Sequence, residues 1–92
     1  MNLRKVKLAL TVDLLNTKSR ENLLNLVKEK MLNFRQEVGK LIEQTLIKKS
    51  PLVNGHIKQS YVIKYENCTL DIDLITNPND RNQYVYTFEL QP

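Results

Sequence analysis

The stretch LLNLVKEKMLNFRQEVGKLIEQTL, residues 23–46, decides the fold because its apolar residues recur at the spacing of an α-helix. Thr17 or Ser19 could cap such a helix, and Pro51 would end it. The spacing therefore predicts one long amphipathic helix of about eight turns between these residues. Its apolar side follows a 3-4-3-4-3 pattern through Leu24, Val27, Met31, Phe34, Val38 and Leu41.

The residues on either side of this stretch have the two-residue period of β-strands. Before it, apolar side chains occupy alternate positions at Val6, Leu8, Leu10, Val12 and Leu14. After it, three segments alternate in the same way, over residues 57–65, 68–74 and 84–90. We therefore expect one α+β domain over residues 1–92, with a single long amphipathic helix packed on one face of a four-stranded, mainly antiparallel sheet in the order β-α-β-β-β.

The pairing of the second and third expected strands can be derived from the rule that directly opposed residues share a face. Tyr65 and Cys68 both begin inward-facing alternations, so they should oppose each other across a short turn. This register also places Val62 opposite Asp71. The same alternation predicts that four tyrosines point into the core, namely Tyr61, Tyr65, Tyr84 and Tyr86.

Composition limits the compartment and the class of protein. The single cysteine, Cys68, cannot form an intramolecular disulfide, which favours a reducing cytoplasm. The basic and apolar residues at the N-terminus form too short a run for a signal peptide, and no segment approaches the roughly 20 apolar residues of a membrane span. We expect a cytoplasmic protein with no membrane partner.

The residue types needed for catalysis are scarce. The chain has one histidine, His56, and one cysteine, Cys68, and the derived register separates them along the strands. Asp71 and Asp73 lie on one face of a strand and could chelate Mg²⁺, although outward carboxylates beside Lys58 are the commoner arrangement. We therefore predict no enzyme activity, no cofactor and no metal site, with the aspartate pair left as an open alternative.

Several residues suggest contact with another protein instead. Val62, Ile75 and Val85 are expected to point outward and could form an apolar patch on the open sheet face. Gly39 interrupts the expected helix, which indicates close approach either by another chain or by the chain's own sheet. These features predict a non-enzymatic interaction module that forms homo-oligomers through the open sheet face or an edge strand.

Charge supports an alternative. The net charge is +4, with +6 in residues 1–50 and −2 in residues 51–92. Such asymmetry can attract nucleic acid. The alternative prediction is a nucleic-acid-binding regulatory protein that uses basic residues of the N-terminal half, namely Arg4, Lys5, Lys7, Lys18, Arg20, Lys28, Lys30 and Arg35.

Overall fold

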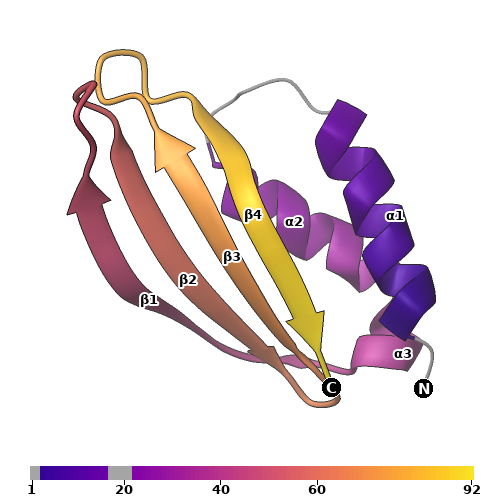
Figure 1. Cartoon of the computed structure of the whole chain (residues 1–92). Coiled ribbons are helices and arrows are strands. Elements are labelled where there is room, and N and C mark those ends of the chain that lie inside the picture. The colour runs from indigo at the N-terminus through magenta and orange to yellow at the C-terminus, as the bar shows by residue number, and fades with distance from the viewer. Residues whose placement is uncertain (1–2, 17–21) are drawn as a thin grey trace.

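A computed structural model describes residues 3–16 and 22–92 of the chain. In this part of the chain, helices precede an antiparallel sheet whose strands lie in the order β1-β2-β3-β4 (Figure 1). The α+β class is confirmed, but the predicted order β-α-β-β-β and the single long helix are wrong. The elements are α1 (Leu3–Asn16), α2 (Leu23–Leu32), α3 (Arg35–Val38), β1 (Leu41–Pro51), β2 (Ile57–Tyr65), β3 (Thr69–Thr76) and β4 (Gln83–Gln91).

The segment expected to be the first strand is helix α1. Val6 and Leu10 are buried in the core, and Leu14 packs against its edge. Leu8 belongs to the same alternating set, yet it is 65% exposed. An alternating pattern always contains pairs four residues apart, and these pairs also line one side of a helix. Packing of this side against the rest of the protein selects the helix.

The segment expected to be one helix is divided into two helices and a strand. The first part of the predicted stripe is confirmed, because Val27, Met31 and Val38 are buried. The helical backbone then ends at Gly39, which has a φ of +81°. The following residues form β1, in which Ile42, Thr45 and Ile47 have β-branched side chains that favour strands. The expected helix caps at residues 17 and 19 lie outside the described residues.

The derived pairing of β2 with β3 is confirmed. Val62 lies opposite Asp71, and Lys64 lies opposite Thr69. The Tyr65 amide donates a hydrogen bond of 2.9 Å to the Cys68 carbonyl oxygen, which closes the hairpin. Here local alternation and a short turn were sufficient to determine which residues share a face.

The prediction that all four tyrosines point into the core is wrong for two of them. Tyr61 and Tyr65 face the helices, as expected, but Tyr84 and Tyr86 are exposed. A bulge in the pairing of β3 with β4 places Val85 opposite Leu74, so Val85 packs against the core instead of pointing outward. One extra residue in a strand reverses the face of every residue beyond it.

The helices do not cover the whole sheet. They lie beside β3 and β4, with α1 farthest from β1, as Figure 1 shows. α1 and α2 both pack against β4. The buried core lies under β2, β3 and β4, and along β1 every residue except Ser50 is exposed. The fold thus leaves the helix-side face of β1 open.

Candidate functional site

Strand β1 is one of the two edges of the sheet, and β4 is the other. β1 pairs with β2 along one side only and stands at the end of the strand order. Four large apolar side chains are exposed along it: Leu41 by 46%, Ile42 by 55%, Leu46 by 46% and Ile47 by 61%. An edge strand with unpaired backbone groups and apolar side chains is a template for pairing with another strand.

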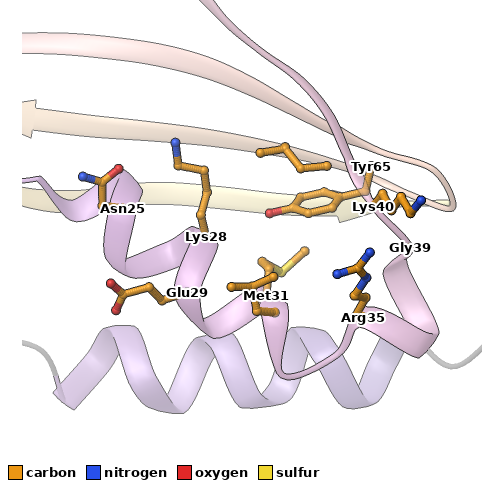
Figure 2. A pocket seen from close by; sticks show the side chains of 10 residues that line it. Asn25, Lys28, Glu29, Met31, Arg35, Gly39, Lys40 and Tyr65 are labelled. Atoms are coloured by element: carbon orange, nitrogen blue, oxygen red, sulfur yellow. The ribbon is translucent and has the colours of Figure 1, made fainter.

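A groove adjoins the start of β1, between the sheet and the helices α2 and α3 (Figure 2). Its cavity volume is about 540 Å³. Met31 and Tyr65, which also belong to the core, form its inner wall, and the exposed Leu32 and Leu41 extend that wall toward the surface. The groove is therefore an outward continuation of the hydrophobic core.

Three basic side chains line the same groove. Lys28 comes from α2, Arg35 from α3 and Lys40 from the residue before β1. Lys28 and Arg35 extend from the helices toward the sheet on either side of the Tyr65 ring (Figure 2). Glu29 is the acidic residue of the lining, so the groove combines apolar walls with a surplus of positive charge.

Tyr65 places a polar atom in this apolar wall. Its side chain is only 6% exposed, and its ring lies across the groove with the hydroxyl pointing along it (Figure 2). Burial, with a smaller contribution from the neighbouring Cys68 thiol, raises the pKa of Tyr65 to about 12. The hydroxyl therefore remains a neutral hydrogen-bond donor at physiological pH.

Gly39 shapes the end of the groove through a contact within the chain. A Cβ atom at this position would lie 2.7 Å from the Cβ of Glu66, in the turn between β2 and β3. Glu66 is held there because its Oε1 accepts a hydrogen bond of 2.6 Å from the Lys40 amide. The predicted close approach at Gly39 is thus made by the chain's own hairpin, and a contact with another chain at this residue stays a prediction.

The predicted outward patch is not assembled as expected. Val85 packs against the core. Ile75 pairs with Lys58 and Tyr84 outside the core cluster, but it is only 5% exposed. Val62 is half-buried between Thr45 and Asp71. Four exposed apolar side chains lie instead on β1, which the sequence interpretation had assigned to a helix, and others lie on α1, at Leu8, Val12 and Leu15.

The predicted basic residues are distributed over separate surfaces. Arg4 and Lys7 line a second hollow beside the C-terminal end of β4, whereas Lys28 and Arg35 line the groove. Lys30 lies 4.0 Å from the carboxylate of Asp13 on α1. Lys5 lies on α1, and residues 18 and 20, which are Lys18 and Arg20, fall outside the described residues.

Asp71 and Asp73, the pair considered for metal binding, are not joined by further metal-binding side chains among the described residues. Asp73 forms an ion pair with Lys58 at 3.7 Å, and Asp71 lies between Val62 and Glu89. Within residues 3–16 and 22–92, no three His, Cys, Asp or Glu side chains form a group that could hold a metal ion.

His56 and Cys68 flank opposite ends of the β2–β3 ladder, as the derived register predicted. The His56 amide donates to the Asn54 side chain at 3.1 Å, and its buried Nδ1 atom has no hydrogen-bond partner in the described structure. Burial raises the pKa of the Cys68 thiol, which disfavours the reactive thiolate. Because they lie at opposite ends of the ladder, the His56 and Cys68 side chains are too far apart to act as a nucleophile and its base.

Sequence reasoning missed the groove and the open strand because it placed both inside one helix. A signal was available: glycine directly after the last apolar residue of a helical stripe is typical of a helix C-terminus. Gly39 occupies that position, directly after the buried Val38. Ending the helix there would have released the following residues to form a strand, and Lys40 and Leu41 would have been placed at its start.

Comparisons with protein-family models, curated proteins and solved structures find no match to this chain. Among the described residues, no helix combines the length and the apolar character needed to cross a membrane. β1 and the groove are therefore the features of this chain that indicate a function.

Proposed function

We propose that this chain is a small, non-enzymatic protein-interaction module that self-associates by antiparallel pairing of β1 with β1 of a second copy. The exposed apolar edge of β1 is the observation that supports the proposal most strongly. Protective features of an edge strand, namely lysines and a proline, are present only near its end, at Lys48, Lys49 and Pro51. Residues 41–47 contain no lysine or proline, although Glu43 and two bulges lie along them, and together with Lys48 they form the segment that pairs in this proposal.

Charge favours the antiparallel direction. Glu43 opposes Lys64 and Lys48 opposes Ser60, and the bulge between Leu46 and Lys48 puts both side chains on the outer face of the sheet. A two-fold axis near Thr45 and Leu46 would place Glu43 of each copy beside Lys48 of the other. Parallel pairing in register would instead oppose like charges, which is destabilising. A two-fold interface is also the commonest arrangement of homo-oligomers.

The open helix-side face of β1 gives the second copy apolar surface to bury. Leu41 lies opposite Tyr65 and Leu46 opposite Tyr61, so both leucines are on the side that faces the helices. The helices pack against β4 and leave these leucines exposed. Pairing of two copies would shield them and would also satisfy the backbone groups of β1.

Charge reversal provides a direct test. Glu43→Lys gives a chain with two lysines at the paired positions, and Lys48→Glu gives a chain with two glutamates. Each variant alone should form weaker dimers than the unchanged protein, whereas an equimolar mixture should form heterodimers. Sedimentation equilibrium and native mass spectrometry measure these species, and circular dichroism checks that each variant is folded.

Two results would refute the proposal. The first is a strict monomer of the unchanged chain at millimolar concentration. The second is a mixture of the two variants that associates no better than each variant does alone, which would exclude this antiparallel register. The nucleic-acid alternative receives less support, because Arg4 and Lys7 lie in a different hollow from Lys28 and Arg35. The free, buried Cys68 fits a cytoplasmic location, which we also propose.

A further inference from the structure

The groove between α2 and the start of β1 has the dimensions and walls of a small-molecule site. Ligand pockets commonly occupy about 300–1,000 Å³ and have mainly apolar walls. The cavity here measures about 540 Å³ and is walled by Met31, Leu32, Leu41 and Tyr65. It lies between the helices and the sheet, next to the core, in a space that no side chain of the described residues fills (Figure 2). Its apolar walls suit an apolar chain.

The Tyr65 hydroxyl indicates that the occupant also carries a hydrogen-bond acceptor. The Tyr65 backbone amide is bonded to the Cys68 carbonyl oxygen, but no group in residues 3–16 and 22–92 accepts a hydrogen bond from the hydroxyl. Among the described residues, His56 Nδ1 is the one fully buried side-chain polar atom without a partner, so the Tyr65 hydroxyl oxygen is open to the groove and can be reached from it. An acceptor supplied from outside the chain would have to reach the hydroxyl along the groove.

The charges of the lining indicate that this acceptor is an anion. Lys28, Arg35 and Lys40 line the groove, and within the described residues none of them forms an ion pair with a carboxylate. Hydrogen bonds to ionised groups are stronger than those between neutral groups, and nearby cations strengthen the binding of a carboxylate further. Arg35 and Lys40 are exposed and Lys28 is half-buried, so a purely apolar occupant would leave these charges to water and would gain nothing from them.

We propose that this groove binds a long-chain carboxylate, with the alkyl chain against Leu32 and Leu41 and the carboxylate accepting a hydrogen bond from the Tyr65 hydroxyl. Lys28 and Arg35 supply the opposing charge from either side of the tyrosine ring. This inference does not depend on self-association. A hairpin of a second copy fits the groove less well, because its Lys48 and Lys49 would bring positive charge toward the basic lining.

The test uses laurate, a soluble fatty carboxylate, titrated into the full chain below its micelle concentration. Isothermal titration calorimetry measures binding, and tyrosine fluorescence provides a second signal because the chain has no tryptophan. We expect saturable binding of one laurate per chain. Dodecanol retains the alkyl chain without the charge, and acetate retains the charge without the alkyl chain, so both should bind much more weakly.

Two substitutions locate the site. Tyr65→Phe retains the ring and removes only the hydroxyl, and it should weaken laurate binding by about tenfold. Lys28→Met should weaken it several-fold, whereas Lys64→Met removes the same charge on the outer face of β2 and should leave binding unchanged. Thermal unfolding confirms that the variants are folded.

Three results would overturn the proposal: no saturable binding of laurate, equal binding by Tyr65→Phe, or equal affinity for dodecanol. Each result leaves the proposed self-association intact, because that property is measured by the charge-reversal mixture. Conversely, a strictly monomeric chain that binds laurate with the expected dependence on Tyr65 would support the groove and refute the dimer.

Discussion

Replacing Gly39 by alanine should destabilise the protein for two separable physical reasons. The backbone at Gly39 has φ +81° and ψ −164°, a region that residues with a side chain rarely adopt. This conformational strain should cost about 1–3 kcal/mol. The new methyl group would also lie 2.7 Å from the Cβ of Glu66. Relief of such overlap by shifts of the surrounding atoms adds about 1–3 kcal/mol.

The surroundings of Gly39 limit how far this clash can be relieved. The Cβ of Glu66 cannot rotate away, because it is bonded directly to the backbone. That backbone is tied to Lys40 by a hydrogen bond of 3.0 Å from the Glu66 amide to the Lys40 carbonyl oxygen. The Lys40 amide donates in return to the Glu66 side chain at 2.6 Å. We therefore expect Gly39→Ala to lower the free energy of unfolding by about 2–6 kcal/mol.

Gly55 provides a matched control. Its φ is +83°, almost equal to that of Gly39, but a Cβ atom there would have no neighbour within 4 Å. Gly55→Ala should thus show the cost of a positive φ without a steric overlap, and Gly39→Ala should be less stable than this control by at least about 1 kcal/mol. For a domain of this size each kcal/mol corresponds to about 4–8 °C in Tm.

Urea unfolding followed by circular dichroism measures both variants, at one protein concentration so that any self-association acts equally on them. Equal losses in the two variants would show that the contact between Gly39 and the β2–β3 turn is absent. The division of the predicted long helix at Gly39 would then lose its main support.

Three further outcomes follow from the burial and the pKa values. Leu10→Ala should cost about 2–5 kcal/mol, as for other buried leucines, whereas Leu8→Ala should change the free energy of unfolding by less than about 0.5 kcal/mol; similar losses for both in urea titrations would indicate a strand in place of α1. Because the pKa of Tyr65 is raised to about 12 in the folded chain from an ordinary value of 10.0, unfolded Tyr65 loses its proton first, so the contribution of Tyr65 to stability should be present below pH 10 and should be lost as pH rises toward 12. Absorbance of tyrosinate should show a late titration step that Tyr65→Phe removes, and persistence of the step in that variant would contradict the assignment. Cys68 should react with a thiol reagent only slowly in the folded chain and rapidly in urea, since burial raises the pKa of its thiol; equally fast reaction in both conditions would show that the thiol is exposed.

Local pattern was sufficient wherever a short turn joined two segments. The register of β2 against β3 follows from the alternation on each side of the turn at Glu66 and Asn67, and it places Val62 opposite Asp71 as predicted. The burial of Val27 and Met31 likewise follows from helical spacing. In these cases the residues that contact each other are close in the chain, so the pattern contains the information.

The pattern of apolar residues was insufficient where the same spacing fits both a helix and a strand. Val6 and Leu10 fit a strand and a helix equally well, and the exposure of Leu8 follows only once the helix packs on the core. The bulge that turns Tyr86 outward leaves no strong local signal, because it depends on how β4 fits against β3.

The sequence by itself determined the α+β class, the hairpin of β2 with β3, and the absence of an intramolecular disulfide. Only the tertiary structure decided that α1 is a helix, that β1 is an open edge, and that Lys28, Arg35 and Tyr65 line one groove. The physical reason is that side chains from α2, α3 and β2 meet there across long separations in the chain. The packing of the helices on the sheet decides which surfaces stay exposed, and the periodicity within one segment cannot predict that packing.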